Sequence, residues 1–361
     1  MADQYKDAGV DYEILDAAKR LALEKALSTS PFLAANGGAA HDSSRGQSAF
    51  VFDVGELTLA LVVEGLGTKA MLARRYLDET GHDFFGAMAY DTVAAIVNDL
   101  CSVGAVPLVV NAYFSTGDAA WLEGGSHFES LVEGWRKACE DAGATWGGGE
   151  SPALPGLVSE KDVELAGSAV GIVPKRPLLG DDLQPGDEIV LVASSGLHAN
   201  GASLARVLVD REGVDLEMPD GTSFVEAVLT PSILYARLVR QLLDLPISYF
   251  SHITGHGFLK VMRPLRPLTY RLKFLPPVPP VLDFMADRLD MDRRAAYTTL
   301  NMGAGWAVYS RPGSGERVVE IARECGHEAW VAGVVEEGPR RVVLEPIGVV
   351  LEGEEMVLAP E

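Results

Sequence analysis

A stretch rich in prolines, glycines and acidic residues interrupts the sequence near its middle. It reads PKRPLLGDDLQPGDEIVLVASSG, residues 174–196, and it leads into a strongly apolar run. Such a composition is typical of a boundary between two folding units. We therefore predict two domains, residues 1–173 and 174–361, and a chain of 361 residues is long enough for each to bury its own core.

Apolar patterns on both sides of this boundary mix helices with strands. We expect helices over about 12–28, 68–78, 86–104, 122–142, 200–210 and 231–244, and strands at SAFVFDV, LTLALVVEG, PLVVNAYFST, VELAGSAVGIV, 188–194, 303–309 and 329–335. The Gly-, Ala- and Ser-rich residues 31–46 predict a mobile loop. Because helices and strands do not alternate regularly, the order argues against a doubly wound nucleotide fold and favours an α+β fold.

Charge and cysteine usage exclude several classes of protein. The formal net charge is −21, and Lys and Arg are scattered, which argues against a nucleic-acid partner. The three cysteines are far apart and form no CxxC pair, so neither a disulfide framework nor a zinc cluster is indicated. No apolar run approaches the roughly 20 residues that cross a bilayer, and the first residues lack a secretion signal. We expect a cytoplasmic protein without a membrane segment.

Two glycine-rich stretches in the first half are candidates for ligand contact. EGLGTK, residues 64–69, ends a predicted strand and opens a helix, so its glycines, the Thr68 hydroxyl and the Lys69 ammonium suit a phosphate. GGGESPALPG, residues 147–156, could wrap a ligand with its N–H groups while Glu150 reaches a metal or a hydroxyl. An ordinary glycine turn and a plain loop are the open alternatives, since short glycine motifs often match by chance.

The predicted helix AMAYDTVAAIVNDLCSVGA carries three oxygen-bearing side chains among apolar neighbours. Seven residues are almost two turns, so Asp91 and Asn98 share one face and Asp99 lies roughly 100° further round. Oxygen donors suit Mg²⁺, which typically sits between a few carboxylates and the phosphates of a nucleotide. The alternative is that Asn98 and Asp99 are solvated and that Asp91 interacts with the helix dipole.

Two stretches in the second half combine histidines with turn residues. In SSGLHANGASL, residues 194–204, a strand ends in small residues and His198 and Asn200 precede a helix, where an anion could dock. HITGHGF, residues 252–258, places two histidines beside glycines in a tight turn. An Asn-capped helix and structural histidines are the open alternatives.

The ordered set of motifs is more specific than any one of them. It comprises YKDAGVD (residues 5–11), EGLGTK, YDTVAAIVNDL, GGGESPALPG, SSGLHANGASL, LTPSILY, HITGHGF and TLNMGAG. Over nearly the whole chain it resembles the phosphoribosylformylglycinamidine cyclo-ligase (aminoimidazole ribonucleotide synthetase) family. The resemblance implies the two-domain AIR synthase-like fold, with a β-rich N-terminal α/β domain that forms the dimer interface and a C-terminal α+β domain.

The resemblance also implies an activity and a set of site residues. The activity is an ATP- and Mg²⁺-dependent ring closure of formylglycinamidine ribonucleotide by a homodimer. The implied nucleotide-binding residues are Lys6, Asp7, Gly65, Gly67, Thr68, Lys69, Asn98 and Glu150, and the implied metal ligands are Glu64, Asp91 and Asp99. The implied substrate-binding residues are Ser195, His198, Asn200, Gly201, Thr254 and Gly255, and the catalytic candidates are Lys69, His198 and His252.

Several motifs depart from the family pattern. The family usually has Asp where this chain has Glu64, reads GGETAEMPG where this chain reads GGESPALPG, and reads TGGGF where His256 replaces a glycine. A histidine there is strained if the position needs a positive φ. These departures leave two alternatives open, namely a divergent ATP-using relative that acts on another amide and a nucleotide-binding homologue without catalytic activity.

Overall fold

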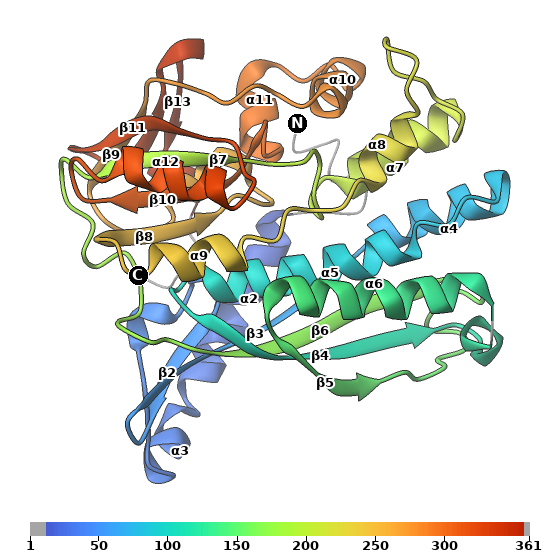
Figure 1. Cartoon of the computed structure of the whole chain (residues 1–361), viewed down its shortest axis with the longest axis horizontal. Helices are drawn as coiled ribbons and strands as arrows, with labels where there is room; N and C mark the ends of the chain where they lie inside the picture. The colour runs from blue at the N-terminus through green and yellow to red at the C-terminus, as the bar shows by residue number, and fades with distance from the viewer. Residues whose placement is uncertain (1–11, 124, 357–361) are drawn as a thin grey trace.

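Six strands of the first half form one twisted sheet in the order β1-β2-β3-β6-β4-β5 (Figure 1). The computed structural model describes residues 12–123 and 125–356. All neighbours in this sheet are antiparallel except β4 and β5, which are parallel. The strands are β1 (Gly38–Ala40), β2 (Phe50–Val54), β3 (Leu57–Gly65), β4 (Val106–Thr116), β5 (Thr145–Glu150) and β6 (Val163–Ile172).

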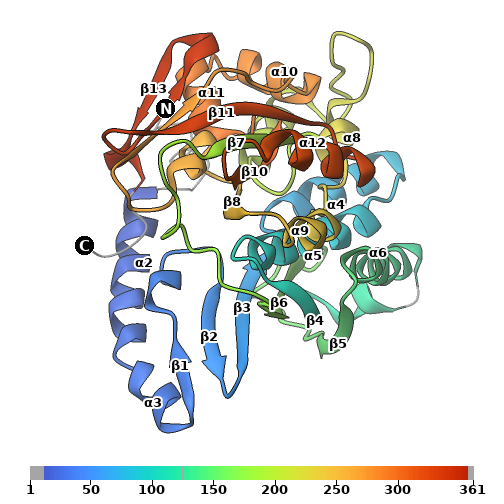
Figure 2. The ribbon, with the colours of Figure 1, turned by 60° about the vertical axis from the view of Figure 1, so that its left-hand side comes forward.

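Helices cover one face of this sheet. They are α4 (Lys69–Thr80), α5 (Phe85–Cys101) and α6 (Ser126–Ala142), while α2 (Tyr12–Leu27) and α3 (Ser30–Ala35) lie beside β1 and β2 (Figure 2). The crossing of α5 and α6 is close, because a Cβ atom on Gly134 would lie 2.1 Å from the carbonyl oxygen of Gly86. The opposite face of the sheet carries exposed apolar side chains, among them Leu57, Leu61 and Val63 of β3.

The second half contains a seven-stranded sheet in the order β13-β12-β9-β11-β7-β10-β8. Its neighbours are antiparallel except β12 and β9. The strands are β7 (Glu188–Ala193), β8 (Ile247–His252), β9 (Leu268–Leu272), β10 (Ala304–Ser310), β11 (Ala329–Glu337), β12 (Arg341–Leu344) and β13 (Val349–Glu352). The helices are α7 (Ala202–Glu212), α8 (Phe224–Leu229), α9 (Ala236–Leu242), α10 (Pro280–Arg288), α11 (Arg293–Thr299) and α12 (Gly315–Glu324).

Helix α5 lies at the seam between the two halves. The first sheet packs on one side of it and α9 on another, while α4 packs against α7 and α8 (Figures 1 and 2). As a result α5 is buried almost all round, and its polar side chains Asp91 and Asn98 are buried as well. Buried polar groups need hydrogen-bond partners, so these two side chains are where the halves are expected to be bonded together.

The α+β fold is confirmed, and the strands and helices expected from apolar periodicity are found within a few residues of their expected bounds, apart from the shorter α9. The loop predicted over residues 31–46 is wrong, and the plain-loop alternative for GGGESPALPG is wrong for its first four residues. Residues 31–46 contain most of α3, the strand β1 and a 3₁₀ turn at Asp42–Ser44, because β1 pairs with β2. The GGGE of the predicted loop belongs to β5, where a Cβ atom on Gly149 would lie 2.0 Å from the carbonyl oxygen of Ala112. Within the described ranges, no helix is long and apolar enough to cross a membrane.

Candidate active site

A buried ion pair lies at the centre of the seam. The Lys69 ammonium, at the start of α4, is 2.5 Å from a carboxylate oxygen of Asp91 on α5, and both side chains are fully buried. The other donors of Lys69 cross to the C-terminal half, where Nζ lies 2.8 Å from the carbonyl oxygen of His198 and 3.4 Å from that of Thr230. The ammonium group therefore has three oxygen partners drawn from both halves.

The segment Thr230–Tyr235, which joins α8 to α9, is held by two side chains of α5. Asp91 accepts a hydrogen bond from the backbone N–H of Ser232, and Asn98 binds the segment twice. Its Nδ2 donates to the carbonyl oxygen of Ile233 at 2.9 Å, and its Oδ1 accepts from the N–H of Tyr235 at 2.9 Å. These contacts satisfy polar groups that would otherwise be buried without partners.

A second charged cluster lies at the other end of the seam. Nδ1 of His252, the last residue of β8, lies 2.7 Å from a carboxylate oxygen of Asp99 on α5, and this oxygen is the acceptor. Burial and the hydrogen-bonded carboxylate of Asp99 raise the pKa of Glu64, at the end of β3, to about 7. Burial also raises the pKa of Asp99, but His252, with Arg263 and Lys260, holds it below its usual value. Two carboxyl groups and an imidazole thus meet where the strands end.

The turn that follows β3 contains a left-handed glycine with an open backbone. Gly67 has φ +69°, and a Cβ atom on it would meet no other atom within 4 Å, so its backbone faces open space. Thr68 contacts Ser203 of the C-terminal half through the two hydroxyl groups at 3.1 Å. Lys69 and Asn98 are buried at the seam, whereas Glu150 is exposed at the end of the edge strand β5, away from their contacts. Lys6 and Asp7 lie outside the described residues.

The predicted substrate residues lie in two turns of the C-terminal half. Ser195 donates its hydroxyl to the carbonyl oxygen of Pro231 at 2.7 Å. Asn200 is exposed, and Gly201 caps α7 with φ +102°. The second turn contains the half-buried residues Thr254 and Gly255, followed by His256, which has φ +72°. The expected strain is confirmed at His256, because the left-handed region disfavours a side chain.

Sequence reasoning named the motif TLNMG but missed the role of its asparagine. Asn301 donates to the carbonyl oxygens of Gly196 and Leu197, at 2.8 and 3.2 Å, and accepts from the hydroxyl of Ser194 at 2.8 Å. It therefore shapes the turn that carries the predicted substrate residues. The signal in the sequence was an asparagine two residues before a glycine, which is typical of a turn. In the structure Gly303 has φ +96°.

The donor set for a metal ion is small. Among residues 12–123 and 125–356, no group of three or more His, Cys, Asp or Glu side chains is arranged to hold a metal ion. Both carboxylate oxygens of Asp91 already accept hydrogen bonds, from Lys69 and Ser232. Glu64 and Asp99 place two carboxyl groups together, and Mg²⁺ is commonly bound by one or two carboxylates together with phosphate oxygens.

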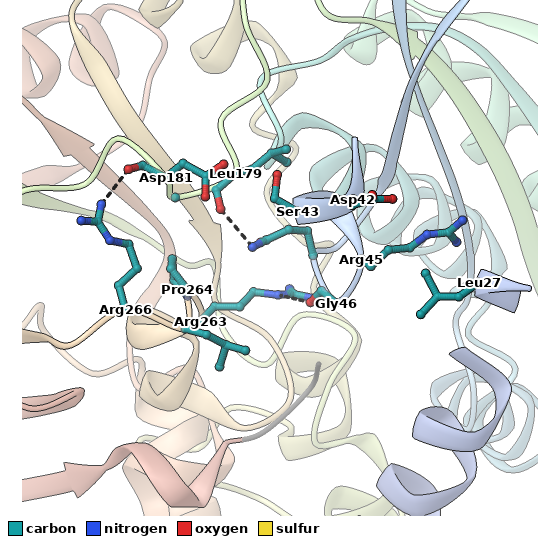
Figure 3. A pocket seen from close by; sticks show the side chains of 13 residues that line it. Leu27, Asp42, Ser43, Arg45, Gly46, Leu179, Asp181, Arg263, Pro264 and Arg266 are labelled. Carbon is teal, nitrogen blue, oxygen red and sulfur yellow. Dashed lines mark hydrogen bonds between the residues drawn. The ribbon is translucent and has the colours of Figure 1, made fainter. Parts of the chain in front are cut away.

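A pocket of about 380 Å³ adjoins the seam (Figure 3). It lies between the end of α2, the segment before β2 and the turn that follows the 3₁₀ helix Gly257–Met262. Arg263 closes one side by donating to the carbonyl oxygen of Gly46, through Nε at 3.1 Å and Nη2 at 3.0 Å. Arg45 and Arg266 lie on opposite sides of the pocket in Figure 3. Asp99 and His252 do not line this pocket, although the charge of Arg263, which does line it, acts on the Asp99 carboxylate.

Family models match both halves of the chain. The N-terminal domain of AIR synthase related protein matches residues 46–173, and its C-terminal domain matches residues 184–345. The chain belongs to the AIR synthase related protein family. Two relatives named phosphoribosylformylglycinamidine cyclo-ligase are 33% identical (Alkaliphilus oremlandii; 94% of this chain, 99% of the relative) and 34% identical (Anaeromyxobacter sp.; 96% and 100%).

A solved structure of the hydrogenase maturation protein HypE in complex with ATP has a similar fold. It is 19% identical to this chain, covers 81% of it and 83% of its own length, and gives a TM-score of 0.57. This AIR synthase family member therefore shares its architecture with a protein of different name. At this level of identity the likeness concerns the fold alone.

Proposed function

We propose that this chain is an ATP-dependent ligase that converts formylglycinamidine ribonucleotide to aminoimidazole ribonucleotide, ADP and phosphate in purine biosynthesis. The observation that carries the proposal is the convergence of predicted site residues from both halves, Lys69, Asp91 and His198, at one seam. Near-full-length similarity to two proteins named as this cyclo-ligase supports it, and the ATP complex of a fold neighbour supports the choice of nucleotide.

The reaction needs two steps at the formyl group, the first at its oxygen and the second at its carbon. The formyl oxygen attacks the γ-phosphorus of ATP and ADP leaves. A nitrogen of the same substrate then attacks the formyl carbon and loses a proton. The C–O bond breaks, and phosphate leaves with the former formyl oxygen. A neutral His252 that donates Nδ1–H to Asp99 has its lone pair on Nε2. We propose that Nε2 of His252 accepts the proton of the attacking nitrogen, because an imidazole oriented by a carboxylate is a common general base.

The remaining residues bind and orient. The open backbone around Gly67 and the Thr68 hydroxyl suit the phosphates of ATP, and the turns at Ser195 and Thr254 suit the sugar phosphate. Glu64 and Asp99 would hold Mg²⁺, which supplies charge neutralisation at the phosphates when bound. For Lys69 and Asp91 to meet phosphate or metal directly, each would have to give up contacts that it makes at the seam.

We also propose that two copies pair through the uncovered face of the first sheet. This face exposes apolar side chains, with Val63 71% exposed, and its strands have no covering helix in Figure 2. Exposed apolar patches of this kind are typical of protein–protein interfaces, so a second copy of the chain could cover this face. The exposed apolar side chains that the strand register places on this face are Val54, Leu57, Leu61, Val63 and Tyr113. The free cysteines among the described residues fit the cytoplasm that we propose as its location.

The proposed dimer can be tested by measuring the mass of the protein in solution. Val63→Asp is expected to convert a dimer to a monomer, because a carboxylate would be desolvated in the interface. Sedimentation velocity at several concentrations measures this. Leu265→Asp, at a 52% exposed site in the C-terminal half, serves as the control and is expected to leave the mass unchanged. A wild-type protein that sediments as a monomer would remove the interface.

The proposed activity is tested by phosphate release from purified protein. ATP with Mg²⁺ alone is expected to release little phosphate, and adding formylglycinamidine ribonucleotide is expected to raise the rate to the range of about 1 to 10³ s⁻¹ usual for enzymes. A folded protein that binds ATP but shows no substrate-dependent release would favour the homologue without catalytic activity. Release that requires a different amide would favour the divergent enzyme.

A further inference from the structure

The hydrogen bonds of the His198 imidazole are compatible with only one of its two neutral tautomers. Its Nε2 lies 3.1 Å from the backbone nitrogen of Ser195 and 3.4 Å from that of Ile233. Both backbone groups are N–H donors, so Nε2 must be the acceptor, and in the neutral ring the proton then resides on Nδ1. Nδ1 is buried and has no hydrogen-bond partner among the described residues.

The surroundings of His198 disfavour a positive charge. The side chain is 4% exposed, and the cationic Lys69 is bonded to the carbonyl oxygen of the same residue. Asp91, the carboxylate paired with Lys69, has both oxygens engaged, by Lys69 and by the N–H of Ser232. Burial, and to a smaller extent nearby positive charge such as that of Lys69, lowers the pKa of His198 to about 3. These surroundings therefore favour the neutral imidazole of His198.

The backbone of His198 is held in a costly conformation. Its φ is +60°, in the left-handed region that a residue with a side chain seldom adopts. The Lys69 ammonium is bonded to its carbonyl oxygen, while the ring bonds the turn at Ser195 to the segment at Ile233. Such strain persists where surrounding contacts over-determine it. A glycine would relieve the strain here but would lose both ring contacts.

We propose that His198 is a positioning residue: it stays neutral, accepts two backbone hydrogen bonds through Nε2, and clamps the turn at Ser195 to the segment Thr230–Tyr235. It takes no part in proton transfer. The inference revises the sequence-based prediction of a catalytic His198, and its link to turnover rests on the proposed function. Together with Lys69, Asp91 and Asn98, His198 fixes the loop that shapes the substrate side of the seam.

The tautomer is tested by nitrogen NMR on ¹⁵N-histidine-labelled, full-length protein, with the His198 signals assigned by their loss in His198→Gln. We expect a protonated Nδ1 and an unprotonated Nε2, unchanged between about pH 5 and 8. A ring that titrates within this range, or that carries its proton on Nε2, overturns the proposal. This measurement does not depend on turnover, so it decides the role of His198 even if the proposed function fails.

Kinetics of two variants test the clamp itself. Gln places an oxygen acceptor near the position of Nε2, whereas Phe keeps the ring shape without an acceptor. We expect His198→Phe to lower kcat/KM by about tenfold or more, mainly through KM, and His198→Gln to recover most of that loss. A kcat reduced about 100-fold or more in folded His198→Gln, without recovery relative to Phe, would indicate proton transfer and overturn the proposal. Should His198→Phe fail to fold, the wild-type protein and the Gln variant still decide the outcome.

Discussion

Replacing Lys69 with methionine is expected to lower the free energy of unfolding by about 3–5 kcal/mol, because the change leaves the buried Asp91 carboxylate without its counter-charge. Lys69 and Asp91 are both fully buried, so water cannot replace the lost partner. Two carbonyl oxygens of the C-terminal half, those of His198 and Thr230, lose a donor as well. Urea denaturation of purified protein measures the change.

A lysine in an exposed ion pair serves as the control for Lys69, because it carries the same charge without being buried. Lys137 pairs with Asp141 on the surface of α6, and Lys137→Met is expected to leave the urea midpoint close to that of the wild-type protein, because exposed ion pairs contribute little. The double variant Lys69→Met, Asp91→Asn is expected to recover much of the loss, since it removes both buried charges. If Lys69→Met costs no more than Lys137→Met, the ion pair does not hold the two halves together.

Asp99→Asn is expected to lower kcat by about 10²–10⁴-fold, because His252 would lose the carboxylate that supports it as a general base. The fold should survive, since the asparagine oxygen still accepts from Nδ1–H of His252, which lies 2.7 Å away. Turnover at saturating ATP, Mg²⁺ and substrate gives the rate, and a Mg²⁺ titration of nucleotide binding reports any weakened metal affinity.

Asp244 provides the control for Asp99. It is an exposed partner of Lys175, away from the carboxyl cluster, and Asp244→Asn should leave kcat within about a factor of two. Equal turnover by wild-type protein and Asp99→Asn, with both folded, would take the Asp99–His252 cluster out of the reaction.

Apolar periodicity predicted much of the architecture because strands and helices bury their faces locally. The apolar run LTLALVVEG predicted β3, and a helix-like segment from about residue 86 to 104 predicted α5. The method failed where the partner of a segment is distant. Gly38–Ala40 becomes a strand only because β2 lies beside it, and the glycines of β5 fit because they allow close approach to β4. Composition alone assigned both stretches to loops.

The chemistry of individual side chains was harder to predict than the motifs that contain them. A lysine after a glycine turn suggested a surface charge or a phosphate ligand, yet Lys69 is buried because residues about 130 and 160 positions later supply its acceptors. The resemblance named His198, but its tautomer depends on N–H groups of Ser195 and Ile233. By contrast, the strain at His256 could be predicted from the resemblance, because the family has a glycine where this chain has His256, and φ there is positive.

Isotope transfer from the substrate tests the central claim of ring closure by phosphate activation. Formylglycinamidine ribonucleotide labelled with ¹⁸O in its formyl group is incubated with ATP, Mg²⁺ and the protein, and the released phosphate is analysed by mass spectrometry. We predict that the label appears in the phosphate, in step with formation of aminoimidazole ribonucleotide. Unlabelled phosphate released at the same rate would show that water attacks ATP, and it would contradict the proposed reaction.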